Sequence, residues 1–257
     1  MLGRPDKREA VLTRDLRAAL ARLNPELPAE AIEQAVQVLT RHDFTRSLAQ
    51  QNHDFYRLIL DGVPVTVRDA KGTLQHPRAR VIDFNDATQN RFLVVRELEI
   101  TGLRAPSYNR RADLVCFVNG LPLVFIELKA VYKNIRAGFD GNLCDYMDEH
   151  VIAHAFHHNA FLIVSNGHRA RYGSITSEWD HFAEWKRQDE TDKGSVDAEV
   201  LLDGMLAKDR LLDIIENFIL FDESKPGRTR KVVARNHQVL GVNQAVASHL
   251  CRLRLGR

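Results

Sequence analysis

Two apolar runs joined by Asn119-Gly120 constrain the fold of this chain more than any other feature. Residues 113–118 and 121–128 are rich in Val, Leu, Ile and Phe, and short apolar runs bounded by turn signals are typical of buried strands. Asn-Gly between two such runs is the strongest short-range signal for a β-hairpin. The sequence therefore predicts a hairpin of two buried strands over residues 113–128.

The segments around this hairpin predict helices before and after a mixed sheet. Apolar residues recur at helical spacing over 12–23, 32–39 and 48–59, and at Gly62 the period changes to about two. We expect short strands at 63–67, 81–84 and 92–95, a helix from about 134 to 158, strands at 161–164 and 169–173, a loop at 188–197 and a helix at 201–220. This order predicts an α/β or α+β fold. We divide it into an N-terminal helical segment (1–60), a core that contains the sheet (61–187) and a helical linker (188–257).

Composition places the chain among ordinary globular proteins. Of its 257 residues, 44% are apolar and 27% are charged, which excludes a disordered, collagen-like or disulfide-scaffold chain. The N-terminus is charged, and the chain contains no apolar run of roughly 18 residues. We therefore expect neither a membrane span nor a secretion signal. The three cysteines, Cys116, Cys144 and Cys251, are scattered, which predicts reduced thiols in a cytoplasmic protein.

Two further groups of ionisable residues have simple interpretations. His154, His157 and His158 lie close together without a cysteine spacing that completes a zinc site, so we expect a solvated helix face. The formal net charge is only +2, yet residues 224–257 contain eight basic residues and no acidic one (Lys225, Arg228, Arg230, Lys231, Arg235, Arg252, Arg254 and Arg257). This tail is expected to be solvated, or to contact phosphates or an acidic partner surface.

Three ionisable residues stand at the ends of the two apolar strands. Asp113 opens the first strand, while Glu127 and Lys129 end the second and, being two residues apart, share one face. Buried charges must be paired or bound to a metal, and carboxylates suit Mg²⁺, which keeps several waters and takes only one or two protein carboxylates. The group therefore suggests a magnesium site with a nearby ammonium. A salt bridge between strand-end residues is the alternative.

The register of the hairpin decides between these interpretations. A two-residue loop at Asn119-Gly120 in an otherwise regular hairpin would set Asp113 opposite Ile126, so that Asp113 and Glu127 would point to opposite sides of the sheet. A three-residue loop over 118–120, or an equivalent one-residue bulge, would bring Asp113 to the face of Glu127. Pro122 cannot donate a ladder hydrogen bond and fits an irregular start to the second strand. A shared metal site therefore requires that loop or bulge.

The residues around this hairpin resemble a known family. Asp113 followed by Glu127-Leu128-Lys129 resembles the PD-(D/E)xK nuclease signature. The whole stretch 112–129 resembles the hairpin in the N-terminal nuclease domain of the restriction (R) subunit of type I restriction-modification enzymes. The resemblance extends over about 44–247 and includes 90–95, 165–171, 173–174, 182–186, 211–218 and 235–238.

The resemblance implies a PD-(D/E)xK restriction-endonuclease-like core, a mixed β-sheet flanked by helices with an N-terminal helical segment, and Mg²⁺-dependent cleavage of double-stranded DNA. By resemblance, Asp113, Glu127 and the backbone carbonyl of Leu128 would bind Mg²⁺, and Lys129 would serve the attacking water. The family's Gln-x-x-x-Tyr pair near the DNA corresponds to Asn142 and Tyr146, with the shorter Asn in place of Gln. Ala112 replaces the usual Pro before the aspartate.

The same resemblance implies a larger assembly. Gln238 matches a glutamine that helps to recognise adenine just before the family's motor, but the sequence has no Gly-x-x-x-x-Gly-Lys-Ser/Thr loop. ATP would therefore serve only a motor outside this chain, with 188–257 as the linker toward it. The implied partners are DNA and the methyltransferase and specificity subunits. A non-catalytic module that docks the motor on the methyltransferase core is the alternative, and a solitary repair- or RNA-directed nuclease is a third hypothesis.

Overall fold

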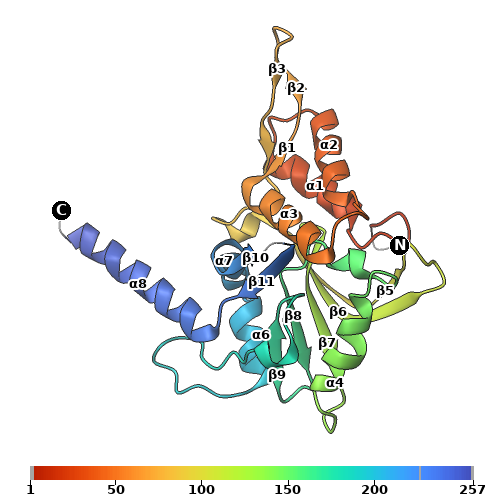
Figure 1. Ribbon diagram of the computed structural model, residues 1–257. Helices are drawn as coiled ribbons and strands as arrows, with labels where there is room; N and C mark the ends of the chain where they lie inside the picture. The colour runs from red at the N-terminus through yellow and green to blue at the C-terminus, as the bar shows by residue number, and fades with distance from the viewer. Residues whose placement is uncertain (1–2, 226, 256–257) are drawn as a thin grey trace.

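A five-stranded mixed sheet forms the centre of the molecule. The computed structural model describes residues 3–225 and 227–255, with side chains as far as Cys251. The strand order is β5 (Phe92–Thr101), β6 (Asn109–Val118), β7 (Leu121–Leu128), β8 (Phe161–Ser165) and β9 (Ala170–Gly173). Only the β7–β8 pair is parallel, and helices flank the sheet (Figure 1). The expected α/β architecture, a mixed sheet flanked by helices, is confirmed.

Three helices precede the sheet, as their apolar spacing predicted. They are α1 (Thr13–Leu23), α2 (Ala29–Thr40) and α3 (Leu48–Asp61). The N-terminus of α3 is fixed by a capping box, in which the Ser47 side chain accepts from the N–H of Gln50 and the Gln50 side chain accepts from the N–H of Ser47. The apolar faces of α1, α2 and α3 are buried. Buried apolar residues of these helices belong to the same core as Leu121, Val124 and Ile163 of the sheet.

Two apolar cores cover the two faces of the sheet. We call the one that contains residues of α2, α3, α6 and α7 the first core. The second core contains Phe139, Leu143 and Tyr146, from the segment between β7 and β8. Successive residues of β6 alternate between them, with Cys116 in the first core and Val115 in the second, as the pleat of a strand buried on both faces requires.

The hairpin has a two-residue loop and a bulge. Val118 pairs with Leu121, and the register shifts by one residue between Cys116 and Phe117 because Leu123 is extra on β7. Asn119 and Gly120 have φ of 51° and 83°, as a type I′ turn requires. The three-residue loop is therefore wrong, and the one-residue bulge after Pro122 is confirmed. A Cβ on Gly120 would come within 2.6 Å of the Leu12 carbonyl oxygen, which places the turn directly against the start of α1.

The alternating valines after Gly62 form only short strands. β1 (Val63–Pro64) pairs with β4 (Arg78–Ala79), and β2 (Val67–Arg68) pairs with β3 (Leu74–Gln75). Together they make a ribbon that projects from the body (Figure 1). The strand expected at 81–84 is wrong, because the Asp83 carboxylate accepts from the N–H groups of Asn85 and Asp86 and so turns the chain. The next element is the 3₁₀ turn η1 (Ala87–Gln89).

The long helix expected from 134 to 158 is largely wrong. The structure has α4 (Arg136–Gly138), a π-helical turn η2 (Phe139–Leu143), α5 (Cys144–Tyr146) and, after a turn, the 3₁₀ helix η3 (Ala153–Phe156). The Asp148 side chain accepts from the N–H of His150, a local bond that competes with helix continuation. The helical part of this segment lies beside the end of β7.

The C-terminal part contains a hairpin that the sequence did not predict. After β9 come η4 (Trp179–His181) and the expected loop. The helix expected at 201–220 is split into α6 (Ala198–Leu206) and α7 (Lys208–Asn217), and β10 (Ile219–Lys225) and β11 (Arg228–Val233) precede α8 (Asn236–Leu255). The segment 188–257 is therefore not wholly helical. The first core draws residues from 1–60, 61–187 and 188–257 alike. Among the helices described, none combines the length and apolarity needed to cross a bilayer.

Candidate functional site

The end of β7 brings together the three ionisable residues that the sequence singled out. The outermost pair of the β6–β7 ladder is Leu114 with Ile126, so the next residues outward, Asp113 and Glu127, lie opposite each other. The N–H of Leu128 donates to Oδ2 of Asp113 over 2.8 Å, and Nζ of Lys129 donates to Oε1 of Glu127 over 3.1 Å. Asp113, Glu127 and Lys129 therefore form one group at the carboxyl end of β7.

A kink shared by β5 and β6 aims Asp113 at this group. Ala112 and Val115 both lie in the second core, although residues three apart on a regular strand face opposite sides. Their partners on β5, Leu98 and Val95, are also three apart and also both lie in the second core. Glu97, opposite Asp113 where the ladder is interrupted, has φ of 52°, which is uncommon for a residue other than glycine. Irregularities of this kind re-aim side chains beside functional sites. The sequence did not reveal Glu97, because nothing about a glutamate in an apolar strand signals a kink.

The Glu127 carboxyl is buried beside a second carboxyl. Its residue is only 2% exposed. Burial raises the pKa of Glu127 to about 7, and the nearby Asp113 carboxylate raises it too, whereas the ammonium of Lys129 acts in the opposite direction. The buried carboxyl is therefore held less favourably in its charged form than a carboxyl in water, and the ammonium of Lys129 offsets only part of that cost.

A polar side-chain network connects Glu127 to the helical segment that follows. Nζ of Lys129 donates to Oδ1 of Asn142 over 2.9 Å, and the amide of Asn142 donates to Oε1 of Glu127. The same amide lies 3.3 Å from the hydroxyl of Tyr146, which donates to the carbonyl of Arg111 over 3.2 Å. Burial, followed by the charge of Glu127, raises the pKa of Tyr146 to about 12. Asn142 and Tyr146 therefore lie together beside the β7 end, as their spacing of four predicted.

Gly138 allows the helical segment to approach β7 closely. A Cβ at this position would lie 2.6 Å from Cγ1 of Val164, 3.3 Å from Cγ of Glu127 and 3.4 Å from Cε of Lys129. Any larger residue would push α4 away from the two site residues. Gly138 was not among the residues predicted from the sequence, although an isolated glycine inside a segment of helical pattern is a signal for such close packing.

The donor set at the β7 end fits a hard divalent cation. Among the described residues, no group of three or more His, Cys, Asp and Glu side chains is placed to hold a metal ion together. Two adjacent carboxylates, one of them with a raised pKa, match the one or two protein carboxylates that Mg²⁺ takes while it keeps several waters. Leu128 lies between Glu127 and Lys129 at the strand end, with its N–H bonded to Asp113, and its carbonyl remains an expected ligand.

The structure does not bring Gln238 to this group. Its side chain accepts from the N–H of Arg235 at the start of α8, and no hydrogen bond or ion pair among the described residues joins it to the β7 end. The basic tail is only partly as expected, because Lys231 is buried in β11 and 1% exposed, whereas Arg228 and Arg230 are exposed. The side chains of Arg252, Arg254 and Arg257 lie outside the described residues.

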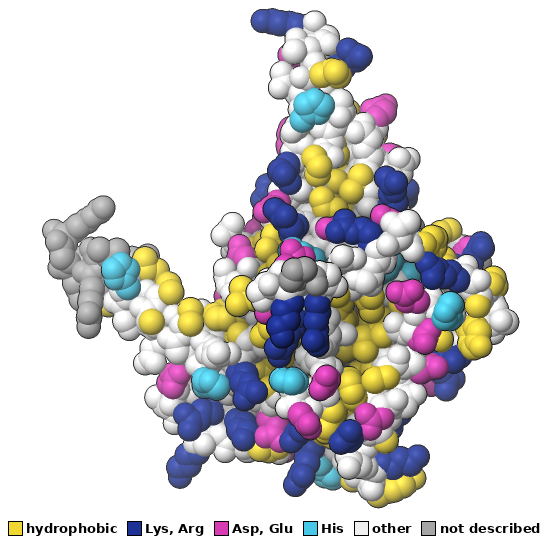
Figure 2. All heavy atoms as spheres, viewed as in Figure 1, with side chains coloured by type: hydrophobic (Ala, Val, Ile, Leu, Met, Phe, Trp, Pro, Cys, Tyr) yellow, Lys and Arg dark blue, Asp and Glu magenta, His cyan; other side chains and the backbone are white. Residues whose placement is uncertain are grey.

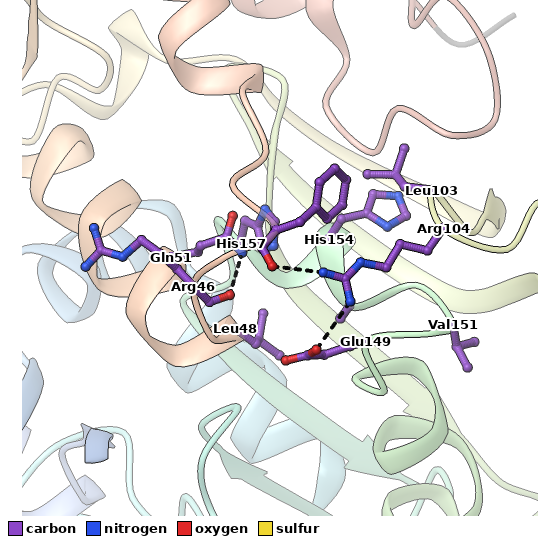
Figure 3. Close-up of a pocket in the computed structure, with 11 residues that line it drawn as sticks. Arg46, Leu48, Gln51, Leu103, Arg104, Glu149, Val151, His154 and His157 are labelled. Atoms are coloured by element: carbon purple, nitrogen blue, oxygen red, sulfur yellow. Dashed lines mark hydrogen bonds and ion pairs between the residues drawn. The ribbon is translucent and has the colours of Figure 1, made fainter. Parts of the chain in front are cut away.

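The solvated histidine face is wrong. His154, His157 and His158 are 7%, 4% and 4% exposed, because the chain turns at this point instead of presenting a helix face. Burial lowers the pKa of His154 to about 4, of His157 to about 2 and of His158 to about 3. His154 and His157 lie at a small hollow bridged by Arg104, which donates to the Phe44 carbonyl and pairs with Glu149 (Figure 3).

The chain is similar to subunits of type I restriction enzymes. A family model described as type I restriction enzyme R protein N terminus matches residues 2–181. The HindI endonuclease subunit of Haemophilus influenzae is 37% identical over 254 residues, which cover 96% of this chain and 23% of that protein. The putative MjaIXP endonuclease subunit of Methanocaldococcus jannaschii is 27% identical over 264 residues, 95% of this chain and 24% of that protein.

These similarities cover nearly the whole chain but about a quarter of either relative's length. The family model matches well over half of the chain, and the matched residues include Asp113, Glu127 and Lys129. The chain therefore belongs to the family of N-terminal regions of type I restriction enzyme R subunits.

Proposed function

We propose that this chain is an Mg²⁺-dependent DNA endonuclease domain of the PD-(D/E)xK type, which cleaves phosphodiesters with a water nucleophile and has no sequence readout of its own. The observation that carries the proposal is the meeting of Asp113, Glu127 and Lys129 at the β7 end. The relatives named endonuclease subunits support it. We also propose that it works in the cytoplasm with the methyltransferase and specificity subunits of its system.

Each residue of the site has a distinct task. Asp113 and Glu127, with the Leu128 carbonyl, would hold Mg²⁺, which when bound supplies Lewis-acid stabilisation of the phosphate charge. Lys129, held between Glu127 and Asn142, orients the attacking water and stabilises the negative charge that develops on the phosphate. Asn142 accepts a hydrogen bond from the ammonium of Lys129, and Tyr146 holds Asn142 in place beside the DNA.

The test is plasmid nicking in a titration of Mg²⁺ or Mn²⁺, with metal binding measured by calorimetry. Wild type is expected to bind metal and cut, Glu127→Ala to lose both, and Lys129→Ala to keep metal binding but lose cutting. Glu26→Ala removes an exposed carboxylate elsewhere in the chain and serves as the matched control. Wild type that binds no metal and cuts no DNA would overturn the proposal.

A second candidate function, docking of other parts of the R subunit, is favoured by α8. Val242, Val246 and Leu250 lie four residues apart on this helix and are 51%, 53% and 51% exposed, and α8 extends away from the body (Figure 1). Such a stripe is typical of a helix that packs against a partner. Loss of assembly by Val246→Glu with unchanged nicking would assign docking to α8 and cleavage to the β7 end.

A further inference from the structure

A groove opens beside the candidate site, at the carboxyl ends of the parallel strands β7 and β8. Its volume is about 450 Å³, and its walls include Tyr132, Lys133, Ile135, Arg169, Arg171 and Trp179. Ligands of sheets with parallel strands bind outside their carboxyl ends. The loop that forms one wall begins directly after Lys129, and Lys129 itself is bonded through its N–H to the carbonyl of Ser165 at the end of β8. The groove therefore lies at the same edge of the sheet as the β7 end, and its lining begins three residues after Lys129.

The walls of the groove are held in place by the protein's own hydrogen bonds. The side-chain amide of Asn166, in the β8–β9 turn, donates to the carbonyls of Val131 and Lys133 over 3.1 and 3.2 Å. These two bonds tie the turn after β8 to the loop after β7. The groove is thus formed before any ligand arrives, which lowers the entropic cost of binding.

The charge of the groove is positive. Lys133 and Arg169 are exposed and form no ion pair within the described part of the chain. Arg171 pairs with Glu184 over 3.3 Å and stacks on Trp179 at 5.4 Å, and Glu184 is also paired with Lys186 over 3.2 Å. The single carboxylate of the groove is therefore neutralised, and two free cations remain. Figure 2 shows Lys and Arg side chains along the lower edge of this face of the molecule, interspersed with Asp and Glu side chains.

An aromatic side chain projects at the mouth of the groove. Tyr132 is 86% exposed and Val131 is 57% exposed, so neither side chain is needed for the core. An exposed ring in a groove that also presents cations suits a ligand that combines phosphates with sugars or bases, because the ring can pack on a sugar or base while Lys and Arg contact the phosphates.

We infer that this groove binds the sugar-phosphate backbone of the DNA strand next to the phosphate that is cut, with Lys133 and Arg169 on phosphates and Tyr132 on a base or sugar. The inference rests on the proposed nuclease function and adds to it the surface that holds the substrate. Acidic protein segments are the competing ligand, but the groove lies at the same sheet edge as the candidate nuclease site, which favours DNA.

The test measures binding of a fluorescent 30-base-pair duplex by anisotropy over a series of salt concentrations, in the full 257-residue chain carrying Asp113→Ala so that no cutting occurs. Lys133→Glu with Arg169→Glu is expected to weaken binding at least about tenfold and to lower the salt slope by about 2, since each phosphate contact contributes about 0.9. Tyr132→Ala is expected to weaken binding severalfold with no change in that slope, because it removes a contact with a backbone sugar and no charge.

The control is Arg68→Glu with Lys71→Glu, the same charge change on the exposed β2–β3 ribbon, which lies at the other end of the molecule from α4 (Figure 1). Its affinity is expected to stay within about twofold of the parent. An equal loss of DNA affinity in both double variants would show that the groove is not a specific DNA-binding surface.

Nicking by the same variants on a wild-type background separates this inference from the proposed function. If the groove variants bind and nick DNA normally, the groove is not the DNA-binding surface, and the proposed nuclease function stands. DNA binding that depends on the groove, without metal-dependent nicking by wild type, would overturn the nuclease and keep the groove. Absence of DNA binding in the parent would overturn both.

Discussion

Two polar clusters of this protein hold their ionisable groups in opposite ways: one is partly buried, with Glu127 as its buried member, and the other is buried throughout. The β7-end cluster comprises Asp113, Glu127, Lys129 and Asn142. The inner cluster comprises Asn52, His157, Asn159 and Lys231: the Asn52 amide donates to the carbonyls of His157 and Asn159 over 3.0 and 2.9 Å, and Nζ of Lys231 donates to Oδ1 of Asn52 over 2.9 Å and to the carbonyl of Asn159.

The difference lies in the partners that each cluster offers its titratable groups. In the β7-end cluster an acid and a cation meet at a strand end, and burial beside Asp113 raises the pKa of Glu127 to about 7. In the inner cluster the partners of Lys231 within the described part of the chain are neutral oxygens and aromatic rings, and burial lowers its pKa well below the usual value. Folding therefore favours proton uptake at the first cluster and proton release at the second. In the proposed function the first cluster would supply metal ligands and an ammonium, whereas the second connects α3, β11 and the residues just before β8.

The largest expected effect is acid destabilisation by the buried histidines. Burial lowers the pKa values of His154, His157 and His158 to about 4, 2 and 3, so below pH 6.5 the unfolded chain binds protons that the folded chain does not. Stability that is present above pH 6.5 is therefore lost as the pH falls toward 4. The measurement is urea unfolding of Glu127→Gln, a variant that removes the opposing titration of Glu127 from this pH range. We expect its free energy of unfolding to fall by about 4 kcal/mol between about pH 7.5 and about pH 5.5. Adding His157→Phe should remove about a third of this loss. An unchanged dependence of the free energy of unfolding on pH would contradict the attribution of the loss to the buried histidines.

Asn52→Ala is expected to lower the free energy of unfolding by about 3 kcal/mol, because it leaves buried carbonyls and Lys231 without their partner. The matched change in the β7-end cluster is Asn142→Ala. There we expect a loss of less than about 1 kcal/mol, since solvent reaches this edge, but a clear loss of nicking. Denaturant unfolding of both variants checks the pair, and similar losses would mean that the clusters do not differ in the way described.

Glu127→Gln is expected to stabilise the metal-free protein by about 2 kcal/mol at pH 7.5. The pKa of Glu127 is raised to about 7 in the folded state, so its contribution to stability is present below about pH 4.5 and is lost as the pH rises through about 7. The gain from the substitution should therefore shrink at pH 5.5. Thermal unfolding at the two pH values measures it, and a gain that does not depend on pH would show that Glu127 is not held in this way.

The smallest expected effect is that of Lys231→Met. Its free energy of unfolding at pH 7 is expected to lie within about 1 kcal/mol of the wild-type value. The substitution removes a buried amine that carries no carboxylate partner, and the lost hydrogen bonds offset the relief from desolvation. A loss above about 3 kcal/mol would show instead that the ammonium is charged and well compensated in the folded state. Denaturant unfolding at pH 7 and pH 9 distinguishes these outcomes, because a neutral amine predicts that wild type becomes relatively more stable as the pH rises.

The elements that sequence predicted well are those whose signal is local. The spacing of Leu16 and Leu20 indicated α1, and the apolar runs around Asn119-Gly120 indicated β6 and β7. The helix expected at 134–158 and the strand at 81–84 were wrong because side-chain bonds from Asp148 and Asp83 turn the backbone, and such competition is not visible in apolar periodicity. The β10–β11 hairpin was missed because charged, exposed strands lack that periodicity.

The sequence by itself determined which residues are candidates at the site and which family the chain resembles, since residue type and spacing carry that information. Only the tertiary structure decided that Asp113 faces Glu127, because this depends on the extra residue Leu123 in β7 and on the kink at Glu97. It also decided that Lys231 and the three histidines are buried, and that Lys133 and Arg169 share a groove with Tyr132. Those relations join residues far apart in the chain, and they are set by register, burial and packing, which a single sequence does not encode in any local pattern.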